Sequence, residues 1–348
     1  MISNQPFFSI LIPAYNVENY IRDCFESLVN QTFDDFEIII VDDGSTDQTG
    51  YLCDCFKLNH PEKDIKIIHK KNEGLVLARR TAIDIAKGHF FVYVDSDDFI
   101  EERTLEFLYT DIIESDADLV IFHSNCYQNG KYSFFRNTIF PDRTLLTNDN
   151  KDKYYEATLK HTISNGIWGK AVSRELVDVG KDYSKYKDVT LGEDLLQSLP
   201  YITYSQRIFF DNRELYHYRI RKNSMAHSFD KKRYNSLRKV EYELHNWSQK
   251  WRLEDRENLV MYHALNEAVW GSLRMLSKSN EKLDAEETKV FLYDMSNDTL
   301  FEKYYERIPK NYFGHVKYIT LNNLFNKNMH KLIFDLYTFR IANKIIKA

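Results

Sequence analysis

The chain has 348 residues, of which 43% are hydrophobic and 15% aromatic, and its formal net charge is −5. This length allows one large domain and a smaller one, and the hydrophobic content excludes a wholly disordered chain. The slightly acidic balance gives no indication of a nucleic-acid partner.

The cysteines and the N-terminal residues bear on the compartment. Four cysteines, Cys24, Cys53, Cys55 and Cys126, form neither a CxxC pair nor a metal-ligand spacing, so we interpret them as reduced thiols. The N-terminal MISNQPFFSILIP has no charged n-region and no small-residue cleavage site, and we expect no signal peptide. No apolar run approaches the ~18 residues of a membrane-spanning helix, and we expect a cytoplasmic protein.

Residues 7–123 alternate between apolar runs of strand length and segments of helical periodicity. The predicted strands are 7–12, 36–41, 65–72, 89–94 and 117–123. The predicted helices are 17–31, 45–56 with Ser45 as its cap, 74–88 ending at Gly88, and 101–115. Because continuously apolar strands separated by helices form a parallel sheet covered on both faces, we expect an α/β fold.

The segments just beyond the predicted strands are rich in polar residues. They are PAYN (13–16), DDGS (42–45), NEG (72–74) and DSDD (95–98). In parallel sheets, ligands bind beyond the carboxyl ends of the strands. Carboxylates, an aromatic ring and small turn residues are therefore expected at one rim.

The remainder of the chain has weaker patterns. Residues 126–160 are polar and predicted to form a loop or lid, and 163–177 are predicted to form a turn leading into a helix. Residues 191–205 predict a helix, and 207–224 two strands, a turn and a basic tail. Residues 231–348 are mostly helical by period. We therefore expect a domain at 1–229 and a mainly helical domain at 230–348.

The D-S-D-D stretch places Asp95, Asp97 and Asp98 within four positions. Like charges this close raise each other's pKa and cost stability unless a cation compensates. Mg²⁺ or Mn²⁺ would relieve this repulsion and would supply the positive charge that a diphosphate leaving group needs. The alternative is a solvated acidic turn in which Asp97 or Asp98 caps the next helix. The acidic corner at Asp42 and Asp43 favours the metal interpretation.

Several other residues could complete a nucleotide site. Asp43 could accept from a base or a ribose, Tyr15 could stack on a base, and Arg79 could hold a phosphate. The alternatives are a helix cap made by Ser45 or Asp47 rather than by the aspartates, rim packing for Tyr15, and an exposed helical position for Arg79. Glu193-Asp194 could supply a general base, or could be only a charged helix N-terminus.

The sequence HYRIRKNS brings four polar residues together, Arg219, Arg221, Lys222 and Ser224. Such a cluster could clamp a diphosphate once a loop closes. The alternative is a solvated basic loop.

With these residues assembled, the chain resembles the family 2 glycosyltransferases of the GT-A fold. The resemblance rests on FSILIPAYNVENYIRDCFESLVNQTFDDFEIIIVDDGSTD, on NEGLVLARRTAIDIAKGHFFVYVDSDDFI, and on the W-G-K and G-E-D-L elements. It covers 8–100 almost without interruption, continues to about residue 224, and is absent beyond about residue 230. It implies a Rossmann-like, mostly parallel sheet flanked by helices, as in enzymes of bacterial cell-surface polysaccharide synthesis. It also implies a nucleotide-diphosphate sugar donor, usually UDP-linked, and inversion at the anomeric carbon.

The resemblance also implies residue roles. The nucleotide-sugar would be held by Pro13, Tyr15, Asp42, Asp43, Arg79, Asp95, Ser96, Trp168, Lys170, Arg219 and Arg221. Asp97 would bind Mn²⁺ or Mg²⁺ directly, with Asp95 nearer the ribose and His217 as a further ligand. Asp194 would be the base, supported by Glu193. One departure is Arg80, which stands where the family often has Asn, so Arg80 either alters the donor pocket or points into solvent.

Two other functions compete with this one. A nucleotidyltransferase usually has a Gly-rich loop after its first strand, and PAYNVEN is not one. A non-catalytic subunit or scaffold for an active partner should have lost the carboxylates that this chain retains.

The acceptor is expected to be a glycan, a lipid-linked glycan or a glycoprotein. Residues 330–348 form a basic amphipathic segment that could lie on the inner face of the cell membrane. Alternatively, this segment docks on its own core or on another subunit of a homo-oligomer.

Overall fold

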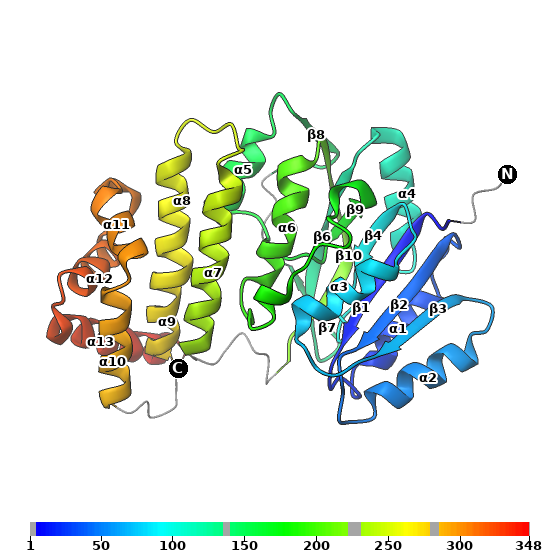
Figure 1. Ribbon diagram of the computed structural model, residues 1–348, viewed down its shortest axis with the longest axis horizontal. Helices are drawn as coiled ribbons and strands as arrows, with labels where there is room; N and C mark the ends of the chain where they lie inside the picture. Colours follow the sequence, from blue (N-terminus) through cyan, green and yellow to red (C-terminus); the bar gives the residue numbers. More distant parts are fainter. Residues whose placement is uncertain (1–4, 135–139, 222–230, 279–284, 348) are drawn as a thin grey trace. The chain divides into compact units, whose positions relative to one another are not determined.

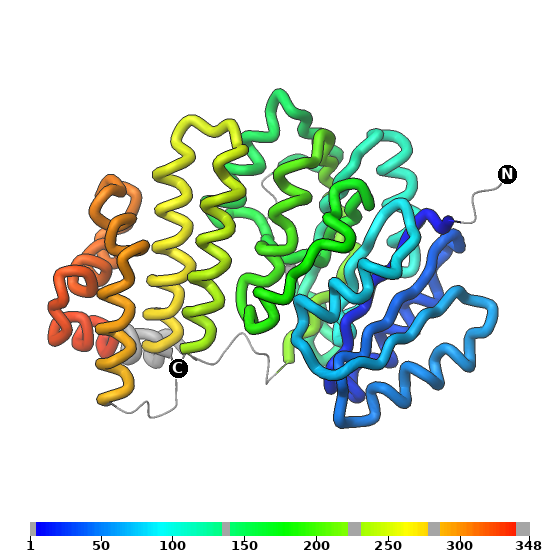
Figure 2. Tube along the Cα trace, viewed as in Figure 1, coloured from blue at the N-terminus to red at the C-terminus, as the bar shows by residue number. Residues whose placement is uncertain are grey.

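A computed structural model describes residues 5–134, 140–221, 231–278 and 285–347 (Figure 1). The chain divides into two compact units, each described by itself. The first is Met1–Tyr155 with Thr162–Lys222, and the second is Glu156–His161 with Asn223–Ala348. The first holds the sheet and the second is built from helices (Figure 1), and the colours of Figure 2 follow the chain from the N-terminus to the C-terminus.

The N-terminal half of the sheet is parallel, as predicted. Its strands, in spatial order, are β3 (Asp64–His69), β2 (Phe36–Asp42), β1 (Phe8–Ala14) and β4 (Phe90–Tyr93). Every residue of β1 and β2 is buried, which is why these strands are continuously apolar in sequence. Ala14 lies opposite Asp42 in the register of β1 and β2, so both strands end at the same rim.

The other half of the sheet is mixed. β9 (Lys170–Ser173) lies antiparallel between β4 and β6 (Leu119–Gln128), and β10 (Arg207–Arg219) is parallel to β6. The short strands β5 (Phe99–Ile100), β7 (Lys131–Phe134) and β8 (Thr144–Thr147) add antiparallel pairs. The sheet order is therefore β3-β2-β1-β4-β9-β6-β10-β5, with β7 on β6 and β8 on β10.

Helices pack on both faces of this sheet (Figure 1). They are α1 (Ile21–Val29), α2 (Thr49–Asn59), α3 (Leu75–Ile85), α4 (Thr104–Ser115) and α6 (Glu193–Tyr204), whereas α5 (Asp152–Leu159) has residues in both units. Apolar residues of α1, α2 and α4 share one core with Phe8, Ile10 and Ile12, which alternate along β1. α3 packs against β1 and β2 and brings Arg79 to the rim.

Three predictions of local structure are wrong. The predicted loop at 126–160 contains β7, β8 and α5, and the helix predicted within 163–177 is β9 followed by a single 3₁₀ turn, Arg174–Leu176. The two strands predicted at 207–224 are one strand, because the polar D-N-R segment at 211–213 forms an irregularity inside β10. β8 and β9 form by pairing with distant strands, whereas β7 forms a hairpin with β6 through the turn at Asn129-Gly130.

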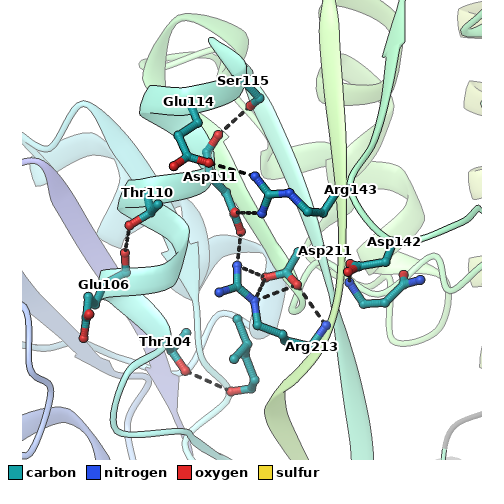
Figure 3. A network of polar contacts seen from close by, with 12 residues as sticks. Thr104, Glu106, Thr110, Asp111, Glu114, Ser115, Asp142, Arg143, Asp211 and Arg213 are labelled. Atoms are coloured by element: carbon teal, nitrogen blue, oxygen red, sulfur yellow. Dashed lines mark hydrogen bonds and ion pairs between the residues drawn. The ribbon is translucent and has the colours of Figure 1, made fainter.

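A network of ion pairs joins the irregular segment of β10, residues 211–213, to α4 (Figure 3). The carboxylate of Asp211 accepts from the backbone and Nε of Arg213, whose guanidinium also binds Asp111. Arg143 donates to Asp111 at 3.2 Å and to Glu114 at 2.8 Å. Burial and the charge of Asp211 raise the pKa of the Asp111 carboxyl to about 6.

Two predicted helix-end residues have other roles. The helix predicted from Ser45 begins at Thr49, and the Ser45 hydroxyl accepts from the backbone N–H of Asn16 at 3.0 Å. Gly88 lies beyond the end of α3, and a Cβ there would be 2.5 Å from the backbone nitrogen of Ser9. Glycine is needed at this position for close approach to β1, and not for ending the helix.

The second unit is helical over its described residues, as predicted. Its helices are α7 (Lys231–Ser248), α8 (Arg256–Ala264), α9 (Gly271–Lys278), α10 (Ala285–Ser296), α11 (Thr299–Arg307), α12 (His315–Phe325) and α13 (Met329–Lys347). Leu332 and Leu336 of α13 are buried, whereas Ile333, Phe334 and Tyr337 are exposed. Among the helices described, none is both long and apolar enough to cross a membrane.

Candidate functional site

The D-S-D-D segment between β4 and β5 is held against β10 by hydrogen bonds. The hydroxyl of Tyr216 donates to Asp98 Oδ2 at 2.7 Å and accepts from the backbone N–H of Asp95 at 3.1 Å. The backbone N–H of Arg219 donates to Asp98 Oδ1 at 2.7 Å. Asp98 is 1% exposed, and burial with the charges of Asp97 and Asp95 raises the pKa of its carboxyl well above the usual range. Asp98 therefore orients the loop, while Asp95 and Asp97 remain for other contacts.

One buried arginine connects this loop to the second acidic pair. Arg79, only 1% exposed, donates through Nη1 to Asp194 Oδ1 at 2.6 Å and through Nη2 to Asp95 Oδ1 at 2.9 Å. Burial raises the pKa of the Asp95 carboxyl, and the charge of Arg79 opposes that rise. The guanidinium therefore brings together the carboxylates of Asp95 and Asp194, which are 99 positions apart in the sequence.

The start of α6 carries the pair Glu193-Asp194, as predicted. Burial and the neighbouring charge of Asp194 raise the pKa of the Glu193 carboxyl to about 7. Lys170 is buried nearby, where its ammonium donates to the Gly166 carbonyl. Burial lowers the pKa of Lys170 to about 8, and the charge of Asp194 opposes that fall. Asp194 thus lies within the field of two cations, Arg79 and Lys170.

The basic residues at the end of β10 also meet the acidic loop. Arg221 Nη2 lies 2.7 Å from Asp97 Oδ2, and Arg219 Nε donates to the Asp97 carbonyl at 2.9 Å. Arg219 Nη2 also donates to Asp23 Oδ2 at 2.7 Å. The structure therefore places both predicted diphosphate-binding arginines at the D-S-D-D loop. Lys222 and Ser224 lie outside the described residues.

The predicted metal ligands differ in how readily they could bind a metal ion. His217 lies with Nδ1 at 2.8 Å from Asn125 Oδ1 and Nε2 at 2.8 Å from Glu101 Oε1, so its ring would have to release one of them to bind a metal ion. Over the described ranges, no three His, Cys, Asp or Glu residues are gathered as a metal site. The carboxylates of Asp95 and Asp97 nevertheless fit Mg²⁺ or Mn²⁺, which often take one or two protein carboxylates and complete their shell with phosphate and water.

The acidic corner after β2 holds the start of α3. Asp43 accepts from the backbone N–H groups of Glu73 at 3.0 Å and Gly74 at 2.8 Å, and burial raises the pKa of its carboxyl. Asp42 accepts from the Ser45 N–H at 3.0 Å. These carboxylates fix the turn, and they lie at the rim shared with β1.

The aromatic residues expected at the site differ in exposure. Tyr15 follows β1 and is 49% exposed, whereas Pro13 is buried within that strand. Trp168 stacks on Tyr216 at 5.2 Å and Tyr218 at 5.7 Å between ring centroids. The Trp168 ring therefore packs on the strand that orients the acidic loop. Ser96 is buried within that loop.

Arg80 does not point into solvent. It is buried, its Nη1 donates to Asp178 Oδ1 at 3.0 Å, and its guanidinium lies 4.4 Å from the Tyr183 ring centroid. The Tyr183 hydroxyl donates to the same Asp178 carboxylate at 3.0 Å. Sequence reasoning missed Asp178 and Tyr183, because neither lies in a motif and the contact with Arg80 spans 98 positions.

Sequence comparisons identify proteins that are similar to this chain. The model of the family described as "Glycosyl transferase family 2" matches residues 9–178. The glycosyltransferase GlyA of Streptococcus pneumoniae is 31% identical over 238 residues, which are 66% of this chain and 33% of GlyA. The glycosyltransferase EpsH of Bacillus subtilis is 30% identical over 233 residues, 66% of each chain. This chain thus spans about a third of GlyA and just under two thirds of EpsH.

Solved structures show the same fold. The structure of S. aureus TarS 1–349 in complex with UDP has a TM-score of 0.69 and 19% identity, with coverage of 96% of this chain and 91% of that one. TarS has also been solved in complex with UDP-GlcNAc, at the same TM-score. The likeness confirms the predicted GT-A type of α/β fold with a mainly helical C-terminal region.

Proposed function

The chain belongs to glycosyltransferase family 2, and on that premise we propose that it transfers a sugar from a UDP-linked donor to an acceptor hydroxyl group. The acceptor would be a glycan, a lipid-linked glycan or a glycoprotein of the bacterial cell envelope. The observation that carries the proposal is the bridge through Arg79, which joins the D-S-D-D loop to the Glu193-Asp194 pair. The UDP and UDP-GlcNAc complexes of TarS support a uridine nucleotide as the donor's carrier.

Asp194 is the proposed general base. It would take the proton of the acceptor hydroxyl while that oxygen attacks the anomeric carbon opposite the diphosphate, which inverts the configuration. Arg79 donates to the Asp194 carboxylate at 2.6 Å and orients it. Glu193, which shares the first turn of α6, supports it.

The donor would lie along the rim of the sheet. Pro13, Tyr15, Asp42 and Asp43 would line the uridine, and Asp95 and Ser96 the ribose. Arg219 and Arg221 would bind the diphosphate, and Trp168 and Lys170 would face the sugar. The position of Tyr15 supports this, since its ring is exposed directly after β1.

Asp97, with Asp95 beside it, would hold Mn²⁺ or Mg²⁺ together with donor phosphate oxygens and water. The ion supplies positive charge to the departing diphosphate. His217 would join only after it releases Asn125 or Glu101. The protein's own contribution is to hold the Asp97 backbone through Arg219.

Residues 1–229 would form the catalytic domain, and the helices of 230–348 would contact the acceptor, a second copy or the inner face of the cell membrane. α13 supports a contact role, because Ile333, Phe334 and Tyr337 are exposed while Leu332 and Leu336 pack inward. The protein would then work in the cytoplasm or on the inner membrane surface.

A donor screen tests this function. Purified protein is incubated with Mn²⁺ or Mg²⁺ and a panel of UDP-sugars, and released UDP is measured. We expect slow hydrolysis of one donor, abolished by a chelator and by Asp97→Ala but not by Asp34→Ala at an exposed position. No hydrolysis and no metal-dependent UDP binding would favour a non-UDP donor or a non-catalytic subunit instead.

A further inference from the structure

A hollow lies in the first unit, beside the D-S-D-D loop, and none of the residues that line it is assigned to the donor. Its volume is about 530 Å³, within the size range of ligand sites, and its walls come from α1, β5, β6 and β7. Three rings line it, Phe99, Tyr127 and Tyr132, together with three carboxylates, Asp23, Glu26 and Glu102. We call it the aromatic groove. We propose that it binds the acceptor as a neutral or amino-bearing oligosaccharide chain, an inference that rests on the proposed function.

The three rings form a continuous series. Phe99 and Tyr127 lie 5.1 Å apart between centroids in an edge-to-face arrangement, and Tyr127 and Tyr132 lie 5.3 Å apart. Tyr132 is 58% exposed, so its face is open to a ligand. A pyranose ring has apolar C–H faces and a hydroxyl rim, and such a ligand matches an aromatic wall edged with polar groups.

The negative charge of the groove favours neutral or amino-bearing oligosaccharides over anionic ones. Ionised carboxylates only accept hydrogen bonds, so Asp23, Glu26 and Glu102 match sugar hydroxyl or ammonium donors. The Arg219 guanidinium beside these carboxylates is already bound to Asp23 and to the Asp97 carbonyl. A chain that carries uronates or phosphates would be repelled by the three carboxylates that line the groove, which disfavours its binding.

Arg219 contacts both the aromatic groove and the D-S-D-D loop. Its guanidinium lies 5.3 Å from the Phe99 ring centroid and 5.1 Å from that of Tyr127, while its backbone N–H binds Asp98. The groove and the D-S-D-D loop therefore share one side chain. This is the arrangement expected of a site that holds an acceptor chain next to the reacting donor.

The test uses the full-length protein on an array of bacterial surface glycans that includes neutral, amino-bearing and anionic chains. We expect the wild-type protein to bind neutral or amino-bearing chains, and Tyr132→Ala to weaken that binding at least tenfold. Glu26→Lys should shift preference toward anionic chains. The matched controls are Tyr51→Ala and Glu62→Lys, at positions that do not line the groove, and neither should change binding.

UDP release from the donor alone is measured on the same variants and separates the two proposals. Tyr132→Ala should leave it unchanged, because Tyr132 has no assigned contact with the donor. If wild-type protein binds no glycan or only anionic ones, or if Tyr132→Ala binds as tightly, the groove assignment is overturned even where UDP release is normal. Glycan binding that depends on Tyr132, without any UDP release, would keep the groove and overturn the proposed transfer.

Discussion

The guanidinium of Arg79 lies 2.6 Å from the carboxylate of Asp194, although the two residues come from different helices 115 positions apart. The same guanidinium binds Asp95 at 2.9 Å, so one buried cation serves both acidic parts of the candidate site. Breaking a buried ion pair leaves an uncompensated charge, which costs far more than losing a pair at the surface. The integrity of the site therefore depends on the fork shape of this one side chain.

Arg79→Lys should lower the free energy of unfolding by about 3 kcal/mol, because an ammonium cannot bind both carboxylates in the geometry of the fork. Urea denaturation measures this change, with the slope m expected to stay constant. The matched control is Arg103→Lys, which alters the exposed pair with Glu106 and should cost less than about 0.5 kcal/mol. Equal effects of the two substitutions would contradict the bridging role.

Asp194→Asn should reduce donor turnover at least 100-fold, because an amide cannot accept the proton that the base must take. The amide oxygen can still accept from Arg79, so UDP binding measured by calorimetry should change little. The split between turnover and binding distinguishes a base from a structural residue. Turnover close to that of the wild type would show that another group is the base.

Glu193→Gln should change the pH dependence of stability. The pKa of Glu193 is raised from 4.5 to about 7, so the protonated carboxyl stabilises the folded state fully below pH 4.5 and this contribution is lost as the pH rises through 7. Glutamine does not titrate. The free energy of unfolding of the variant, relative to that of the wild type, should therefore rise by about 2 kcal/mol from pH 5 to pH 8. Urea denaturation at both pH values measures the gain, and a constant difference would rule out the raised pKa.

The elements that the sequence predicted are those with a strong local signal. β1 and β2 are continuously apolar because both faces of the sheet are covered, and α6 follows a helical period after an acidic start. β9 has four residues and is stabilised by pairing with β4 and β6, which local sequence does not encode. β8 was missed for the same reason, because it pairs with the distant β10. β7 is different, because it forms a hairpin with β6 through Asn129-Gly130, a turn signal that the sequence does carry.

In the candidate site, too, the sequence indicated the residues that have a strong local signal but not the contacts that they make. Asp95, Asp97 and Asp194 stood out because carboxylates follow a strand or begin a helix. Which cation each one meets is decided by the tertiary structure, and that information is absent from the spacing. Arg79 was expected to contact the nucleotide or its phosphates, and nothing in the sequence indicated the two carboxylates that it binds.

Arg80 and Asp178 should be energetically coupled. Arg80 is buried against Asp178 and the ring of Tyr183, so it tethers the segment that leads to α6. A double-mutant cycle with Arg80→Asn and Asp178→Asn should give a coupling energy of about 2 kcal/mol by urea denaturation. An additive result, within about 0.5 kcal/mol, would mean that the pair does not tether that segment.

If Asp97 holds a metal ion as proposed, Arg221 should compete with that ion, because its Nη2 lies 2.7 Å from Asp97 Oδ2. Arg221→Gln should therefore tighten Mn²⁺ binding to the donor-free protein about fivefold, which corresponds to the ~1 kcal/mol of a partly exposed ion pair. The same change should weaken UDP binding in the presence of Mn²⁺, since the guanidinium is then lost to the diphosphate. The spectrum of free Mn²⁺ in electron paramagnetic resonance measures the first effect and calorimetry the second. Arg22→Gln, at an exposed position on α1, is the control for a general loss of positive charge. If Arg221→Gln binds Mn²⁺ no more tightly than this control, Arg221 does not occupy the metal's place on Asp97.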